Sequence, residues 1–341
     1  MMSRTRLEAA TVGIFLVATV GLGAGQNATS GTRSSVNRSG VPRTSWGAPD
    51  LQGVWSTATV TPFERPKEFA DKETLTEHEA AEYAKHVTDA RNVDLRRQVG
   101  QNSDVTSAYN DAWYDRGTRV IPTRRTSLVI DPPDGRIPPL TPEGQARAAR
   151  AIPQSGIQEF RIVDSWLDRG IWERCITRGV PDVMLPTAYN NNYRIVQTKD
   201  TVAILAEMIH DVRVIPLDNR PHLPSNLRQW MGDSRGRWEG DTLVVDTTNF
   251  TNKTVFRGAS ENLHLTERFT RLDKNTLQYR VTVDDPTTFT RPWTIELPAV
   301  RMDAEIYEYA CHEGNYAMRN LLSASRAAER QAAEKKKNTP R

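Results

Sequence analysis

The stretch LHLTERFTRLDKNTLQYRVTV, residues 263 to 283, decides the fold class. Apolar and polar residues alternate with a period of two on both sides of the short Asp273-Lys274-Asn275 joint, which suits a tight hairpin. The residues that share the apolar faces are Leu263, Leu265 and Phe269 before the joint, and Leu277, Tyr279, Val281 and Val283 after it. The stretch therefore predicts two antiparallel strands, each with one buried face.

Further strand candidates surround this hairpin, with turn signals such as Lys199-Asp200 and Glu239-Gly240-Asp241 between them. Because a row of antiparallel strands has unpaired edges unless it closes, we expect a β-barrel and not a flat sheet. A barrel of this size encloses either packed side chains or one small ligand. The predicted strands cover residues 193–198, 201–208, 211–217, 242–250, 263–272, 276–283, 293–300 and 305–311.

The region 60–185 reads differently, as helices and loops that cover the strands. Thr76 and Glu79 have the spacing of a capping box at the start of a helix. The stretch SLVIDPPDGRIPPLTPEGQARAAR, residues 127–150, begins with a short strand and a Pro-rich turn, and Thr141 with Pro142 suits the start of a second helix. We place the barrel strands in 186–312, within a single domain over 49–325, followed by a charged tail over 326–341.

The amino terminus resembles a secretory signal. Arg4 and Arg6 precede an apolar run from Val12 to Leu22, which ends in small residues. We expect cleavage after about Gly25, a flexible leader over 26–48 that is rich in Ser, Thr and Gly, and no stable insertion into a membrane. The mature protein is then periplasmic or secreted.

Composition excludes several classes of function. The 341 residues carry 45 basic and 42 acidic side chains, a formal net charge of +3 that does not favour nucleic acid as a partner. The chain has no phosphate-binding Gly-x-x-x-x-Gly-Lys loop, no Gly-x-Ser-x-Gly elbow and no Cys-x-x-Cys pair. No cofactor is implied, and the oligomeric state is left open.

Cys175 and Cys311 are the only cysteines. In an oxidising compartment they favour a single disulfide bond. Two free buried thiols are an alternative, and so is a reactive thiol paired with His312.

Four phrases, DPPDGRIPPLTPEGQA, MIHDVRVIP, QWMGDSRGRWEGDTLVV and YEYACHEGNY, resemble an uncharacterised exported bacterial family. The stretch LQGVW at 51–55 resembles the Gly-x-Trp start of the first strand in lipocalins and other calycin barrels, carried here by Gly53 and Trp55. The resemblance implies a calycin-like (lipocalin-like) barrel with an inserted helical region, and it assigns no activity.

The segment EMIHDVRVIPL, residues 207–217, carries four ionisable side chains among apolar ones. In extended geometry His210 shares an apolar face with Val212 and Val214, which predicts a histidine lining the barrel, either as a general base or as a core histidine with its bonds satisfied. Asp211 and Arg213 fall on the opposite face, where a simple ion pair is the alternative to a functional role.

Glu267 is a carboxylate on an apolar strand face, so it is either a proton donor beside His210 or the partner of a nearby arginine. His312 is a candidate second base. Arg213, Arg268 or Tyr193 could polarise an oxyanion, and Trp230 and Trp293 could line an aromatic pocket. We predict no metal site, because His210, His264 and His312 lack a compact ligand spacing.

These features suggest an exported enzyme with cofactor-free acid–base chemistry of the isomerase, lyase or hydratase type on a small apolar or aromatic molecule. The alternative is a periplasmic carrier that binds a lipophilic ligand without turnover. A third interpretation, an envelope-associated interaction protein, predicts a barrel filled by side chains.

Overall fold

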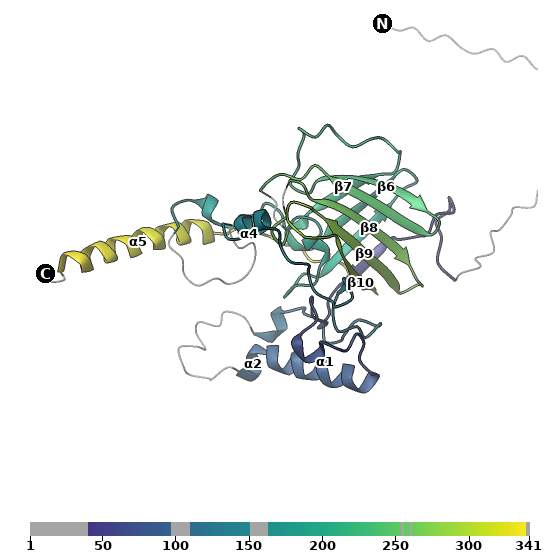
Figure 1. Cartoon of the computed structure of the whole chain (residues 1–341), viewed down its shortest axis with the longest axis horizontal. Coiled ribbons are helices and arrows are strands. Elements are labelled where there is room, and N and C mark those ends of the chain that lie inside the picture. Colours follow the sequence, from purple (N-terminus) through teal and green to yellow (C-terminus); the bar gives the residue numbers. More distant parts are fainter. Residues whose placement is uncertain (1–39, 97–109, 151–162, 254–255, 260, 339–341) are drawn as a thin grey trace, which may run out of the picture. The chain divides into compact units, whose positions relative to one another are not determined.

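The structure, a computed structural model, describes residues 40–96, 110–150, 163–253, 256–259 and 261–338. The predicted signal peptide and the leader up to residue 39 lie outside the described residues. Ten strands form the sheet, and short helices and loops connect them (Figure 1).

The strands are β1 (Gly53–Ser56), β2 (Val129–Asp131), β3 (Asn192–Gln197), β4 (Thr201–Ala206), β5 (Val212–Pro216), β6 (Asp233–Glu239), β7 (Thr242–Thr248), β8 (His264–Arg271), β9 (Thr276–Asp284) and β10 (Trp293–Met302). The α-helices are α1 (Glu77–Arg91), α2 (Val93–Arg96), α4 (Pro142–Ala148) and α5 (Ala317–Asn338). Single 3-10 turns lie at Lys67–Phe69, Asp111–Trp113, Trp166–Asp168, Asp182–Met184 and Met208–His210.

The sheet is antiparallel and unclosed. Its order is β5-β4-β3-β1-β10-β9-β8-β7-β6, and β2 pairs with β10 beside this path. The three predicted hairpin joints connect β3 to β4, β6 to β7, and β8 to β9. Within the described residues no backbone ladder joins β5 to β6. These two strands form the two edges of the sheet, although they are consecutive in the sequence.

The predicted alternation is confirmed in β8 and β9, whereas β10 is buried at every position from Trp293 to Ala299. Every second residue of β8 and β9 is buried, and Tyr279 and Phe269 are fully buried on the same face as Trp55 and Trp293. These aromatic residues belong to one apolar core that also takes in Leu128 and other residues of the region 60–185. Each Å² of apolar surface that is buried contributes about 25 cal/mol of stabilisation. This shared face is therefore the main stabilising feature of the fold.

Two strand predictions need correction. No strand forms over 305–311, because β10 already pairs with β9 along one edge and with β1 and β2 along the other. The strand β6 was not predicted, since Gly236 and four charged residues obscure its alternation. Gly236 has a packing reason: a Cβ there would lie 2.5 Å from Leu217 Cδ2 and 2.9 Å from Ile215 Cγ2. The two edge strands therefore approach each other closely through side chains.

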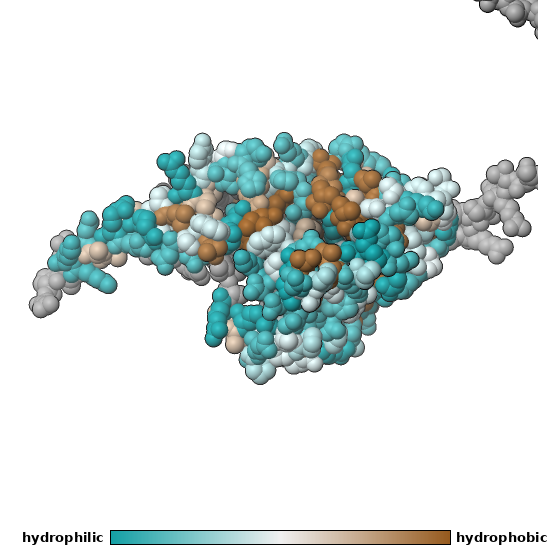
Figure 2. Space-filling model, turned by 90° about the horizontal axis from the view of Figure 1, so that it is seen from above, coloured by the Kyte–Doolittle hydropathy of each residue, from teal (hydrophilic) through white to brown (hydrophobic). Residues whose placement is uncertain are grey.

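The face of β5 is the reverse of the prediction. Val212 and Val214 point outward and are 57% and 59% exposed, whereas Arg213 and Ile215 are buried on the core face. The sequence pattern placed the two valines in the core. Arg213 is buried there instead, because its guanidinium has hydrogen-bonding partners in the core. Figure 2 shows that patches of apolar residues lie among polar ones on the surface in that view.

The helix signals are confirmed. The Thr76 hydroxyl accepts a hydrogen bond from Glu79 N, and the Glu79 carboxylate accepts one from Thr76 N, which completes the capping box of α1. Thr141 caps α4, with Pro142 in its first turn. In the part of the chain that the structure describes, no helix combines the length and apolar character needed to cross a bilayer.

The predicted disulfide is also confirmed. Cys175 and Cys311 are bonded, with their Cα atoms 5.8 Å apart, and their separation in sequence is 136 residues. The bond ties the loop between β2 and β3 to the segment that follows β10.

Candidate functional site

A buried polar cluster lies in the apolar core where the two sheet edges approach each other. Arg213 of β5 donates to Glu267 of β8 with both terminal nitrogens, one at 2.9 Å. Its other hydrogen bonds go to Ser234 of β6 at 3.0 Å and to Thr247 of β7 at 2.8 Å. The Tyr279 hydroxyl donates to Glu267 Oε1 at 2.8 Å. One guanidinium thus connects β5 with the three strands at the other end of the sheet.

Glu267 is therefore paired with an arginine, which was the alternative to its role as a proton donor beside His210. Its side chain is fully buried, and both carboxylate oxygens already accept hydrogen bonds. Burial, with Glu267 nearby, raises the pKa of Tyr279 well above its ordinary value. A carboxylate held in this way offers no free oxygen to a substrate.

His210 is not in the core and does not meet Glu267. It ends a 3-10 turn in which Ile209 and His210 have φ angles of 61° and 48°, so the extended geometry assumed from sequence stops after Ala206. Its ring is exposed, and Nδ1 lies 3.0 Å from Tyr309 O. The predicted acid–base pair of His210 and Glu267 is thus not assembled.

The other predicted site residues are dispersed. Asp211 is half-buried and accepts from the Thr177 hydroxyl at 2.7 Å; burial raises its pKa. His312 is exposed beside the disulfide and lines a hollow of about 330 Å³. Arg268 points to the outer face and donates to Glu239 at 2.9 Å.

The three predicted aromatic contributors also lie apart. Trp230 belongs to the loop 218–232, while Tyr193 and Trp293 are buried in the core. The Tyr193 hydroxyl and Trp293 Nε1 have no hydrogen-bond partner among the described residues. Their roles in binding stay predictions.

A second polar cluster, on the outer face of β6, β7 and β8, was not predicted. Asp233, His222, Asp246 and His264 form an unbroken hydrogen-bonded chain, which we call the His–Asp chain. His222 Nδ1 is 2.9 Å from Asp233 Oδ2, and its Nε2 is 2.8 Å from Asp246 Oδ1. His264 Nε2 is 2.6 Å from Asp246 Oδ2. Arg235 pairs with Asp233 at 2.7 Å.

Exposure changes along the His–Asp chain. The Asp233 side chain is 4% exposed, those of His222 and Asp246 are 28% exposed, and that of His264 is 42% exposed. Both ring nitrogens of His222 face carboxylate oxygens, so the ring is held from two sides. The chain therefore runs from a buried, fixed carboxylate to an imidazole that meets solvent.

The electrostatics favour a protonated His264. The hydrogen bond to Asp246 raises the pKa of His264 above its ordinary value of 6.5, and the charges of Asp246 and Asp284 raise it further, against partial desolvation. In return, the hydrogen bonds from His264 and His222 lower the pKa of Asp246. The described residues contain no group of three His, Cys, Asp or Glu side chains that could hold a metal ion.

The sequence held only part of the signal for this cluster. Alternation places His264 and Asp246 at outward positions of two strands that turn out to be neighbours. Their pairing depends on register, which no local pattern in the sequence specifies. His222 lies in an irregular loop, so nothing in its own segment indicates its partners.

The comparisons with known proteins add little. No protein-family model matches the chain, and no curated protein matches it. Crystal structures of two mutants of the fluorescent protein UnaG are similar to part of it, each with 16% sequence identity, covering 33% of this chain and 72% of that chain, with TM-scores of 0.21 and 0.20. We therefore base the functional proposal on the geometry alone.

Proposed function

We propose that the protein is an exported enzyme that transfers a proton to or from a small molecule, with His264 as the acid–base group. The hydrogen-bonded His–Asp chain carries this proposal. A histidine whose one ring nitrogen is held by a carboxylate has a fixed tautomer and orientation, which acid–base catalysis requires.

In this arrangement His264 Nε2 donates to Asp246, and Nδ1 makes no hydrogen bond to any described residue. Nδ1 is thus the nitrogen that meets substrate. The raised pKa favours the protonated ring, so the imidazolium is a proton donor and its neutral form is the base of the reverse step. His222 and Asp233 are positioning residues, since they act through Asp246.

The loop 218–232 reaches the His–Asp chain through His222. The Leu223 amide donates to Asp233 at 2.9 Å, and Asn249 Nδ2 donates to Leu223 O at 2.8 Å, so the loop is fixed to the sheet. Leu223 and Leu227 are 36% and 50% exposed, which offers apolar contact to a substrate. This supports a small substrate that is partly apolar and has an oxygen or carbon to be protonated.

Export is part of the proposal. The amino-terminal apolar run after Arg4 and Arg6 and the Cys175–Cys311 disulfide both suit an oxidising compartment.

The test is a comparison of matched variants in a screen of lactones, enolisable ketones and activated esters. We expect His264→Gln and Asp246→Asn to lower turnover by about 10² to 10⁴-fold, the usual contribution of a general acid. His78→Gln is the control, because the His78 side chain is 81% exposed on α1. Full turnover in His264→Gln would refute the proposal.

A readout that does not need substrate is the NMR titration of the His264 ring. In the wild type its midpoint lies above 6.5, and in Asp246→Asn it falls, because the charge and its hydrogen bond are lost. A midpoint that does not move would remove the physical basis for an acid–base role.

The second candidate function is binding without turnover, with the sheet acting as a calycin-like barrel. The buried Tyr193 hydroxyl favours it, since its lack of a partner among the described residues leaves a hydrogen bond for a ligand. Native mass spectrometry before and after organic extraction tests this. Binding in the core is supported if a bound molecule dissociates more readily from the Tyr193→Phe variant than from the wild type. The mass of unliganded protein from every preparation would count against it.

A further inference from the structure

A hollow of about 330 Å³ lies beside the Cys175–Cys311 disulfide and shares no residue with the His–Asp chain. One of its walls comes from the loop between β2 and β3, and the other comes from the segment that leads into α5. Sites for small molecules have volumes of about 300 to 1,000 Å³. The hollow is therefore large enough for a compound with a single ring.

The two walls of this hollow are joined by the disulfide and stiffened by hydrogen bonds. Asn315 Nδ2 donates to Cys311 O at 2.7 Å, and Asn315 Oδ1 accepts from Ala317 N at 2.9 Å. On the other wall, Cys175 N donates to Trp172 O at 2.9 Å. A ligand thus meets walls that are already fixed, which lowers the entropic cost of binding.

Arg174 brings to the hollow a positive charge that the protein does not neutralise. Its guanidinium carbon lies 4.5 Å from the centroid of the Trp166 ring, and among the described residues no carboxylate forms an ion pair with it. The adjacent Glu173 is engaged elsewhere, because it accepts from Gly170 N at 3.1 Å and lies 3.5 Å from Arg169 Nη1. Stacking uses the face of a guanidinium, whereas its N–H donors point outward in the plane. The donors of Arg174 are thus available to an anion.

Trp166 provides a surface against which a flat ring can pack. Its side chain lines the hollow, and the residue is 49% exposed. Ile176 on the same wall and Met318 on the other add apolar surface. Aromatic rings pack against each other with centroids about 4.5–7 Å apart. An exposed tryptophan beside a free arginine therefore favours an aromatic anion over a purely polar one.

His312 adds a hydrogen-bond donor on the wall opposite Arg174. It is exposed, and its ring makes no hydrogen bond to any described residue. A carboxylate has two oxygens that accept, so it can bond to an imidazole N–H and to a guanidinium together. The two walls thus present complementary donors to one anionic group.

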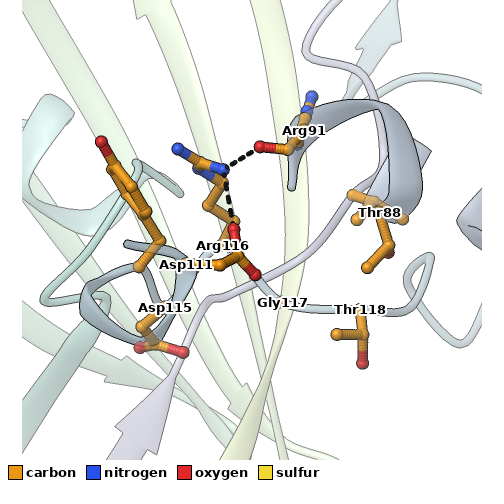
Figure 3. A pocket seen from close by; sticks show the side chains of 9 residues that line it. Thr88, Arg91, Asp111, Asp115, Arg116, Gly117 and Thr118 are labelled. Carbon is orange, nitrogen blue, oxygen red and sulfur yellow. Dashed lines mark hydrogen bonds and ion pairs between the residues drawn. The ribbon is translucent and has the colours of Figure 1, made fainter. Parts of the chain in front are cut away.

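The hollow in Figure 3, between α1 and the segment 110–118, shows the opposite situation. There Arg116 Nη1 donates to Arg91 O at 2.8 Å and lies 3.6 Å from Asp111 Oδ1, as the dashed lines mark. The charge of Arg116 is therefore already used within the protein, unlike that of Arg174.

We propose that the hollow beside the disulfide binds a small aromatic carboxylate. The carboxylate accepts hydrogen bonds from Arg174 and His312, and the ring packs against Trp166. The ligand supplies the negative charge that the protein does not place beside Arg174. Binding here does not depend on an acid–base role of His264, because the two sites have no residue in common.

The test is an NMR titration of the oxidised full chain with three probes. Benzoate has both a ring and a charge, benzyl alcohol has only the ring, and acetate has only the charge. We expect benzoate to give a saturable shift of the amides of residues 173–176 and 312–316, and each of the other probes to bind at least about tenfold more weakly. Equal affinity for benzoate and either other probe, or no saturable shift with benzoate, overturns the proposal.

Variants locate the binding. Arg174→Gln removes the charge, so benzoate should bind about tenfold more weakly and benzyl alcohol as before. Trp166→Ala should weaken benzoate and benzyl alcohol alike and leave acetate unchanged. Arg237→Gln is the matched control, because that side chain is 51% exposed on β6 and does not line the hollow.

Urea unfolding curves identify a variant that does not fold, and in that case the comparison of the three probes on the wild type decides. Wild-type affinity for benzoate in folded Arg174→Gln shows that the site lies elsewhere and overturns the proposal.

Discussion

Replacement of Arg213 by methionine tests whether the buried cluster connects the two sheet edges. The Arg213 side chain is 4% exposed and that of Glu267 is 0% exposed. Arg213→Met keeps an apolar stem of similar length but leaves the Glu267 carboxylate in the core with only neutral donors. Removal of one partner of a buried ion pair costs about 3–5 kcal/mol of the free energy of unfolding. At about 2–4 °C for each kcal/mol, this corresponds to a fall in Tm on the order of 10 °C.

The double variant Arg213→Met, Glu267→Leu sharpens the test. Both charges are gone, and the principal remaining loss is the acceptor of the Tyr279 hydroxyl, about 1–3 kcal/mol. The double variant is therefore expected to be more stable than either single variant. The coupling free energy between the two positions should amount to several kcal/mol, because each single variant leaves one buried charge unpaired and the double variant leaves none.

The assay is urea unfolding of the oxidised protein, followed by the fluorescence of the buried Trp55 and Trp293. Arg237→Met is the control, because that side chain is 51% exposed and its pair with Glu239 should contribute no more than about 1 kcal/mol. If Arg213→Met costs no more than this control, or if the costs of the two single changes simply add, the cluster does not stabilise the core in the way described.

Three further predictions concern other parts of the fold. Because the pKa of His264 is raised in the folded protein, its contribution to stability is complete below pH 6.5 and is lost as pH rises through the folded pKa; urea midpoints of the wild type should fall over that range, while those of His264→Gln should not show this component. Replacement of Cys175 and Cys311 by serine should lower the free energy of unfolding by about 2–5 kcal/mol, measured against wild type without reductant, and an unchanged value would mean that the bridge does not constrain the unfolded chain. Gly236→Val should cost about 1–3 kcal/mol, since its side chain would collide with Ile215 and Leu217; a wild-type midpoint would show that the sheet edges are not in contact there.

The sequence predicted those elements whose cause is local. The capping box of Thr76 and Glu79, the proline-led start of α4 and the alternation in β8 and β9 each depend on residues a few positions apart, and all three are present. The disulfide was predictable for a different reason, because a chain with two cysteines has only one possible internal bridge.

Prediction failed where distant partners decide the outcome. In β5 the pattern placed Val212 and Val214 inside, yet Arg213 is buried because Glu267, 54 residues away, accepts both of its terminal N–H groups. His210 was assumed to be extended, whereas the chain turns at Met208–His210 between β4 and β5. The His–Asp chain joins an irregular loop with three strands, so its residues come together only once the strand register is known.

The order of the strands has a consequence for the continuity of the chain. The first and last strands in sequence, β1 and β10, pair in the middle of the sheet, and the chain passes from one edge strand to the other through the loop 217–232. A protease that cuts this loop would leave two fragments, one with β1 to β5 and the other with β6 to β10. The β1–β10 ladder and the Cys175–Cys311 bond span both fragments. We therefore expect a nicked molecule to stay folded and to separate into halves only when it is both reduced and unfolded, which makes this loop the natural place to divide the protein for complementation.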